Sequence, residues 1–354
     1  MYELDRQMIR RTDCPMCGSF EHTLIYKIFP EDFFYGYVHT TTHLGPEPPD
    51  AYLIWRCEHC GHWFVNPRLP DDQLLACYPQ DRFTKSSGYH QFDSLRRGKI
   101  QKETSRHING KWIKHWQLLA QRLISMNLPI NSILDVGCAD GSFLRQIPPE
   151  WHRVGIDNNL GAISLARELS GDHIKYFCSD LTSLDWQGML FGAVTIFDTL
   201  EHLIDPKKWI IMVSDLLASG GILWISTPSC NSSGAQYFKR NWALLTPAVH
   251  LHYFNKKSLN TVLENCGLKA EHIRIGKASL LSALAVDLKF RKRRLFLKLL
   301  LCFGPISRLL FRMLNSLDII DHKSLFLNKL KNINAAESLR PRLDDNIEII
   351  ARKI

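Results

Sequence analysis

The sequence predicts an α/β fold, in which strands of one central sheet alternate with helices, preceded by a small cysteine-bearing domain. Two observations predict it. From residue 111 onward, segments with apolar residues at helical spacing alternate with short apolar runs such as Ile133–Val136. Before residue 70, two Cys-x-x-Cys pairs occur in a stretch too short to build a large apolar core.

Length and composition fit a soluble globular protein of more than one domain. The 354 residues include 45% hydrophobic and 22% charged residues, with a formal net charge of +9 that favours contact with phosphates or anionic lipid surfaces. The longest apolar run, 295–303, is interrupted by Lys298 and is shorter than the ~20 residues that a spanning helix needs. The N-terminus lacks a signal-peptide pattern, so we expect a cytoplasmic protein.

The four N-terminal cysteines have the spacing of metal ligands. Each Cys-x-x-Cys pair is followed by a glycine, which permits a tight turn with backbone amides near sulfur. Four thiolates close a tetrahedral shell and leave no position for water, so the expected metal is a structural Zn²⁺. Its predicted ligands are Cys14, Cys17, Cys57 and Cys60. We expect His59 and His62 to be bystanders, and the alternative is two unrelated pairs of reduced thiols.

The cysteine spacing predicts a zinc-ribbon domain over residues 1–70, followed by a linker over residues 71–110. The loop between the two knuckles is rich in aromatic residues. We favour a role for them in the core of the small domain over stacking on a substrate. They are Phe29, Phe33, Phe34, Tyr35, Tyr37 and Tyr52.

The first predicted strand of the larger domain runs into a glycine-rich turn, Gly137-Cys-Ala-Asp-Gly141, and then into a helix-forming segment from Ser142. Asp157 ends the next strand, where a carboxylate can accept hydrogen bonds from both hydroxyls of a ribose. The pattern predicts a nucleoside-binding, Rossmann-like domain over residues 111–354. The alternative is a tight turn with a surface Asp.

Four motifs together resemble the class I S-adenosylmethionine-dependent methyltransferases, in the ubiquinone-biosynthesis-like, methyltransferase type 23 branch that carries an N-terminal zinc ribbon. The resemblance covers nearly the whole chain and implies a seven-stranded, Rossmann-like methyltransferase sheet. Its motifs are Cys-Pro-Met-Cys-Gly, Cys-Glu-His-Cys-Gly-His-Trp-Phe-Val-Asn-Pro-Arg, Leu-Asp-Val-Gly-Cys-Ala-Asp-Gly and Phe-Asp-Thr-Leu-Glu-His-Leu-Ile-Asp-Pro.

The resemblance also implies where the donor, S-adenosylmethionine, binds. Asp135, Gly137 and Gly141 would hold its methionine part, Asp157 its ribose, and Asp180 with Leu181 its adenine edge. Further cofactor-binding positions are Ala139, Asn158 and Asp198. Ala139 departs from the family pattern, which usually has glycine there; because a methyl group is a small intrusion, we do not interpret it as inactivation.

Methyl transfer from a sulfonium needs alignment and exclusion of water, and a base helps when the acceptor is a hydroxyl or a carbon acid. The leading candidates are His202, after the fourth strand, and His250, in the segment Val-His-Leu-His-Tyr-Phe. His252 would project to the same side as His250 in an extended segment. We prefer His250, and the alternative is that these histidines only fix loops.

Other patterns complete the expected fold. Asp205 with Pro206 predicts one helix start, and Asn255 predicts another whose helix Gly267 stops. Residues 345–353 resemble the last antiparallel strand of the family's sheet, which we expect beside residues 270–275.

Residues 277–343 are expected to be a helical insertion into this last hairpin, far longer than a usual loop. We favour a lid over the acceptor site. The alternatives are a homodimer contact and a peripheral contact with an anionic membrane or lipid-linked substrate, which would place the protein at the inner face of the membrane. The cations that suggest this amphipathic element are Lys289, Arg291, Lys292, Arg293, Arg294 and Lys298.

The predicted function is methyl transfer to an O or C nucleophile of a small-molecule acceptor, with a sugar or a glycan- or lipid-linked intermediate favoured on the resemblance. One alternative is an RNA methyltransferase, suggested by the net charge and the ribbon. The basic residues cluster late in the chain, which argues against a nucleic-acid partner. Another alternative is a non-catalytic, donor-binding zinc scaffold, for which Ala139 is the only hint.

Overall fold

The computed structural model describes residues 8–29, 50–76, 105–186, 188–242, 244–276 and 345–354. The chain divides into two compact units, residues 1–276 with 345–354, and residues 277–344. The predicted basic insertion and most of the predicted linker lie outside the described residues. The domain boundaries at residues 70 and 110 therefore stay a prediction, and the description below concerns the first unit.

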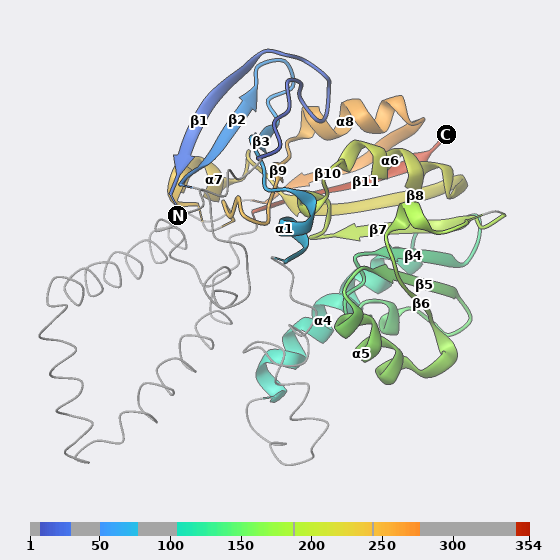
Figure 1. Ribbon diagram of the computed structural model, residues 1–354. Helices are drawn as coiled ribbons and strands as arrows, with labels where there is room; N and C mark the ends of the chain where they lie inside the picture. Colours follow the sequence, from blue (N-terminus) through green and yellow to red (C-terminus); the bar gives the residue numbers. More distant parts are fainter. Residues whose placement is uncertain (1–7, 30–49, 77–104, 187, 243, 277–344) are drawn as a thin grey trace, which may run out of the picture. The chain divides into compact units, whose positions relative to one another are not determined.

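A seven-stranded mixed sheet forms the centre of this unit, with strand order β10-β11-β8-β7-β4-β5-β6 (Figure 1). Six strands run in the same direction, and β11 is antiparallel to both of its neighbours. This arrangement confirms the predicted seven-stranded Rossmann-like sheet, including the final hairpin. The strands are β4 (Ser132–Val136), β5 (His152–Asp157), β6 (Lys175–Cys178), β7 (Phe191–Phe197), β8 (Leu217–Pro228), β10 (Leu268–Ile275) and β11 (Asn346–Lys353).

Helices cover both faces of the sheet, which is why its central strands are almost entirely apolar. Helices α4 (Ser105–Ile124) and α5 (Leu160–Ser170) pack on one face, and α6 (Pro206–Asp215) and α8 (Lys256–Asn265) pack on the other. Strands β5 and β7 flank β4 on its two sides. A crevice is therefore expected at the carboxyl ends of these strands, where ligands bind in open α/β sheets.

The helix starts follow the predicted capping residues. The Asp205 side chain accepts a hydrogen bond from the Lys208 amide, with Pro206 in the first turn. Asn255 and Ser258 form a reciprocal capping box at the start of α8. Satisfying otherwise unpaired amides in this way fixes where each helix begins.

The prediction of a helix after the glycine-rich turn was wrong. Only a single 3-10 turn, η2 (Leu144–Gln146), follows it in the described part of the chain. Pro148 and Pro149 come directly afterwards, and proline disfavours helical backbone at the residue before it and cannot donate the next hydrogen bond.

The small domain is built on a second sheet, with strand order β1-β2-β3-β9. Strands β1 (His22–Ile28), β2 (Tyr52–Cys57) and β3 (Trp63–Val65) come from the cysteine-bearing region, whereas β9 (His252–Tyr253) comes from the larger domain. Tyr52 lies in the core of the small domain, as favoured from the sequence, whereas Phe29 is exposed, contrary to that expectation. Four of the other aromatic residues, Phe33, Phe34, Tyr35 and Tyr37, lie outside the described residues.

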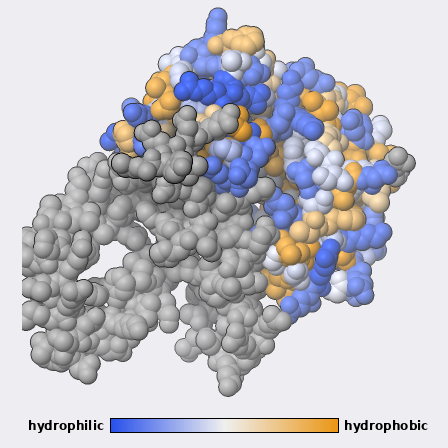
Figure 2. Space-filling view, viewed as in Figure 1, coloured by the Kyte–Doolittle hydropathy of each residue, from blue (hydrophilic) through white to orange (hydrophobic). Residues whose placement is uncertain are grey.

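The remaining described helical elements are short. They are α1 (Asp71–Ala76), α7 (Ser233–Phe238) and the 3-10 turns η3 (Gly171–His173), η4 (Leu181–Ser183), η5 (Leu200–His202) and η6 (Lys239–Asn241). Figure 2 shows hydrophilic residues interspersed with smaller apolar areas over the described part of one face. Among the described helices, none has the length and apolar character needed to cross a membrane.

Candidate functional site

The turn after β4 requires glycine at two of its positions. Gly137 and Gly141 have φ angles of +76° and +72°, a region that side chains rarely adopt. A Cβ atom at Gly137 would lie 2.1 Å from Thr199 Oγ1, and one at Gly141 would lie 2.1 Å from Tyr176 Oη. Any side chain at either position would push the loop away from its neighbours. The two glycines therefore hold the loop close to the ends of β6 and β7.

Ala139 occupies the same left-handed region, with a φ angle of +47°. Such backbone costs about 1–2 kcal/mol for a residue with a Cβ atom. Its amide donates a 3.0 Å hydrogen bond to Asp157 Oδ2, which holds this conformation. The loop therefore accommodates an alanine in this left-handed conformation.

Asp157 links the loop to the end of β5. Its second oxygen, Oδ1, accepts a 2.8 Å hydrogen bond from the Asn159 amide. Burial raises the pKa of the Asp157 carboxyl. A carboxylate has about four lone-pair positions, so both oxygens retain capacity for further donors such as ribose hydroxyls.

The other predicted donor-binding residues lie at or just after the carboxyl ends of the parallel strands but differ in exposure. Asp135 is 4% exposed and accepts a hydrogen bond from Thr195 Oγ1 at 2.7 Å; burial raises its pKa to about 7. The Asp180 side chain caps η4, and Asn158 is exposed. The Leu181 side chain is fully buried in the core, so only its backbone can face a ligand.

Asp198 directly follows β7, which is the neighbour of β4 in the sheet. Its carboxylate accepts a hydrogen bond from Asn346 Nδ2 at 2.6 Å and raises the pKa of Glu201.

A second cluster consists of Glu201, His202 and His250. Each of these side chains offers one atom that could bind a metal ion, and the three atoms lie within 4.8 Å of one another. The ring centroids of His202 and His250 are 4.7 Å apart. His202 Nε2 lies 3.9 Å from Glu201 Oε1. The structure thus brings the two candidate bases together.

Backbone carbonyls fix the tautomer of both rings. His202 Nδ1 donates to Val249 O at 2.9 Å, and His250 Nδ1 donates to Leu244 O at 2.8 Å. Because a carbonyl only accepts, each neutral ring carries its proton on Nδ1 and has its lone pair on Nε2. Burial and His202 lower the pKa of His250 to about 3, so it is neutral at physiological pH.

Glu201 is a candidate site residue that sequence reasoning missed. It is 1% exposed, accepts a 2.8 Å hydrogen bond from Thr227 Oγ1, and has its pKa raised to about 8 by burial and Asp198. An acid inside the apolar segment Thr-Leu-Glu-His-Leu was the available signal. Two imidazole nitrogens and one carboxylate can hold a divalent cation or accept a proton from a bound molecule.

His252 does not share this side with His250, contrary to the expectation for an extended segment. Its Nδ1 lies 3.2 Å from Nε2 of His62, in the small domain. A turn precedes β9, with the His250 amide bonded to Thr246 O, so the period-two alternation begins only at His252. His62 lies outside the four-cysteine group, as expected, and is fully buried against the larger domain.

The four N-terminal cysteines form one cluster with the geometry of a closed shell. The sulfur pairs Cys14–Cys60 and Cys17–Cys57 are each 3.6 Å apart, and all four lie within 4.8 Å of one another. A tetrahedron with Zn–S bonds of about 2.3 Å places its sulfurs about 3.8 Å apart. The donor set and its spacing fit a structural zinc ion.

Comparison with known proteins bears on the larger domain. Residues 103–273 match a family model described as a methyltransferase domain. The matched segment spans just under half of the chain.

Curated relatives of the methyltransferase domain are ubiquinone biosynthesis O-methyltransferases. That of Coxiella burnetii is 30% identical over 109 residues, 30% of this chain and 47% of the relative. That of Xanthomonas axonopodis pv. citri is 32% identical over 162 residues, 40% of this chain and 64% of the relative. The chain therefore spans about half to two thirds of the length of these relatives.

Two solved structures are also similar at low sequence identity. The plantazolicin methyltransferase BpumL, in complex with SAH and a monoazolic analogue, is 15% identical with a TM-score of 0.41, over 77% of this chain and 93% of that chain. The magnesium protoporphyrin IX methyltransferase ChlM of Synechocystis PCC 6803, with bound SAH, is 19% identical with a TM-score of 0.40, over 55% and 90%.

Proposed function

We propose that this protein transfers a methyl group from S-adenosylmethionine to an O or C nucleophile of a small molecule. One observation carries the proposal. A glycine-constrained loop bonded to Asp157 lies at the same ends of the strands as a cluster of two half-buried imidazoles and a buried carboxyl. The first arrangement fits a nucleoside-bearing donor, and the second fits removal of a proton from an acceptor.

The donor is held by the residues around the loop. Asp157 binds the ribose hydroxyls, and the strand ends at Asp180 and Leu181 border the adenine. The loop around Gly137 borders the methionine part, because a glycine backbone permits close approach. The donor supplies an electrophilic methyl group on a sulfonium, so the protein needs no group to activate it.

At the acceptor, His250 Nε2 takes the proton of the attacking hydroxyl or carbon acid. Its Nδ1–H remains bonded to Leu244 O, which keeps the Nε2 lone pair directed away from that carbonyl. The new bond joins the nucleophile to the methyl carbon while the carbon–sulfur bond breaks, and the thioether product leaves uncharged. Glu201 as carboxylate stabilises the imidazolium that forms.

The acceptor class follows from this chemistry. A nucleophile that must lose a proton is a hydroxyl or an acidic C–H, and the relatives are O-methyltransferases by name. We favour a sugar or a glycan- or lipid-linked intermediate, the class implied by the resemblance to zinc-bearing relatives. The four-cysteine zinc ion has a structural role, since its shell leaves no open position.

The proposal is tested in two steps with the full chain. Calorimetry should show saturable binding of S-adenosylmethionine and S-adenosylhomocysteine. Incubation with methyl-labelled donor and fractionated cell extract should place label in a sugar, lipid or other small-molecule fraction. Label in RNA would favour the RNA alternative, and absence of binding by either nucleoside would overturn the proposal.

A further inference from the structure

A buried carboxyl group that the candidate site does not include lies directly before β11. Asp345 is 4% exposed. Its Oδ2 accepts a hydrogen bond from Trp242 Nε1 at 2.9 Å, and its Oδ1 accepts one from the Gly234 amide at 3.0 Å. Its backbone carbonyl accepts a third, from the Ser229 amide at 2.8 Å. The carboxyl group thus binds two residues that lie 103 and 111 positions before it in the chain.

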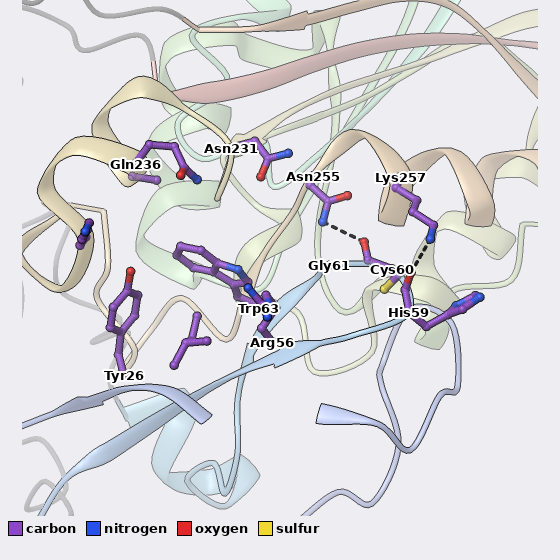
Figure 3. A pocket seen from close by; sticks show the side chains of 13 residues that line it. Tyr26, Arg56, His59, Cys60, Gly61, Trp63, Asn231, Gln236, Asn255 and Lys257 are labelled. Atoms are coloured by element: carbon purple, nitrogen blue, oxygen red, sulfur yellow. Dashed lines mark hydrogen bonds between the residues drawn. The ribbon is translucent and has the colours of Figure 1, made fainter. Parts of the chain in front are cut away.

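The contact with Gly234 anchors the first turn of α7 from its buried side. A Cβ atom at Gly234 would lie 2.3 Å from Asp345 Oδ1, so only glycine lets the carboxyl group come this close. Gln236, two positions along the helix, points to the opposite side and lines an open cavity (Figure 3). The Asp345 carboxyl group therefore binds α7 on the side away from the cavity, where water does not compete for its hydrogen bonds.

Trp242 precedes the segment that carries the predicted base. Its side chain is 2% exposed and packs against Tyr253, with ring centroids 5.7 Å apart. Its backbone carbonyl accepts a hydrogen bond from the Leu245 amide at 3.0 Å. At the other end of the segment, the Leu251 amide donates to Glu201 O at 2.8 Å. The segment is therefore held at its start by Trp242 and at its end by a member of the candidate site.

This segment supplies both carbonyls that fix the tautomers of the candidate bases. His250 Nδ1 donates to Leu244 O at 2.8 Å, and His202 Nδ1 donates to Val249 O at 2.9 Å. Each bond keeps the ring proton on Nδ1 and leaves Nε2 to take a proton from an acceptor. Leu244 is only two positions after Trp242. A displacement of Trp242 would therefore displace the Leu244 carbonyl first.

We propose that Asp345 is a positioning residue for His250. By holding the Trp242 indole, it keeps the Leu244 carbonyl where that carbonyl fixes the Nδ1–H tautomer of the base. Without this anchor, the imidazole proton redistributes towards Nε2, and a ring protonated there cannot take the proton of the attacking group. The inference rests on the proposed function, because that function makes His250 the base. Asp345 takes up no proton itself and acts only through Trp242.

The test compares two variants of the full chain that break the same hydrogen bond from opposite sides. Trp242→Phe removes the indole N–H and keeps a ring against Tyr253, whereas Asp345→Asn presents an amide NH₂ group to one of the two donors. Nitrogen NMR of histidine-labelled protein reports which ring nitrogen of His250 carries the proton, and it needs neither acceptor nor turnover. His250→Ala assigns the signal by its loss. We expect the Nδ1–H form to dominate in the wild type and the Nε2–H form to gain population in both variants.

Turnover with the identified acceptor should follow the tautomer. Each variant should lower kcat about tenfold, the effect of one buried hydrogen bond, while the affinity for S-adenosylhomocysteine stays within about twofold. The double variant should be no slower than the slower single variant, because both substitutions remove one interaction.

Ser232→Ala is the matched control, because Ser232 Oγ caps the same helix by accepting a hydrogen bond from the Ala235 amide at 3.1 Å. It should lower the melting temperature and leave the His250 tautomer unchanged. An unchanged tautomer in both Trp242→Phe and Asp345→Asn would overturn the positioning role. So would an equal change in Ser232→Ala, which would indicate general loosening of α7. Failure to bind S-adenosylmethionine would overturn the proposed function instead, and the NMR result would stand apart from it.

Discussion

Nε2 of His62 lies 3.2 Å from Nδ1 of His252, so a buried imidazole pair joins the cysteine-bearing domain to the strand that follows the candidate base. Strand β9 also completes the small domain's sheet by pairing with β3. Asn255 Nδ2 donates to the carbonyl of Cys60, a predicted zinc ligand, at 3.0 Å. The metal knuckle and the segment around His250 are thus one connected structure.

Replacing a zinc ligand should therefore impair catalysis without direct damage to the donor pocket. We expect Cys57→Ser protein to lose its bound zinc, to melt at lower temperature, and to turn over at least about tenfold more slowly. Affinity for S-adenosylhomocysteine should change much less. Metal analysis, thermal melting and calorimetry measure the three effects.

Cys178→Ser is the control for the cysteine experiment, because Cys178 is exposed and outside the four-cysteine cluster. It should retain zinc. Normal turnover by a zinc-free Cys57→Ser protein would contradict the coupling between the two domains.

His250→Ala should remove the base while the donor pocket stays intact. Loss of general base catalysis lowers turnover by about 10²–10⁴-fold. Donor affinity should stay within about twofold, since His250 contacts His202 and Leu244 rather than the glycine loop. Steady-state kinetics with the identified acceptor, combined with calorimetry, separates the two effects, and full turnover by this variant would exclude His250 as the base.

Asp157→Ala should weaken donor binding. Two ribose hydroxyls lose a charged acceptor, and the loop loses the hydrogen bond at the Ala139 amide, so we expect about 10–100-fold weaker binding of S-adenosylhomocysteine. Asp172→Ala, in the exposed turn η3, removes the same charge away from the site and should leave the affinity unchanged. Equal affinities of the two variants would remove Asp157 from the donor pocket.

The raised pKa of Glu201 predicts a rate that increases with pH. The carboxyl titrates at about 8, so the carboxylate that stabilises protonated His250 forms as pH rises through that value. Turnover should increase between about pH 7 and 9 and then level off. Glu201→Gln should lower turnover and flatten this part of the pH profile.

The same shift has the opposite effect on stability. Between the ordinary glutamate pKa of 4.5 and the folded value of about 8, the native state binds more protons than the unfolded state. The free energy of unfolding should therefore fall as pH rises through this range, and Glu201→Gln should reduce that fall. Asp135, with a pKa raised to about 7, contributes in the same direction, so part of the slope should remain. An unchanged slope in Glu201→Gln would contradict the burial argument.

Ala139→Gly should be neutral or stabilising. Glycine relieves the positive φ angle of +47° but adds conformational freedom to the unfolded chain, so the free energy of unfolding should change by about 0 to +1 kcal/mol. Gly137→Ala is the contrasting variant, because its Cβ would lie 2.1 Å from Thr199 Oγ1. Chemical denaturation measures the change in the free energy of unfolding for both variants. We expect Gly137→Ala to lower this free energy, and to lower it clearly more than Ala139→Gly does.

Local sequence rules predicted the elements that depend on neighbouring residues. Asp205 and Asn255 cap helices because their side chains reach amides three positions ahead. The glycine-rich turn was also predicted, but the helix after it was not, since the two prolines at 148 and 149 decide where the backbone can continue. Glu201 was missed because its significance depends on burial, which a short motif does not specify.

By itself, the sequence determined the cysteine pairs, the glycine turn with Asp157 and the two candidate histidines, and its resemblance implied a seven-stranded sheet with a final antiparallel strand. Only the tertiary structure decided that His250 faces His202 and Glu201 while His252 faces His62, because contacts between residues far apart in the chain depend on sheet pairing. The tertiary structure alone also decided that β9 completes the small domain, since a two-residue strand carries almost no periodic signal of its own.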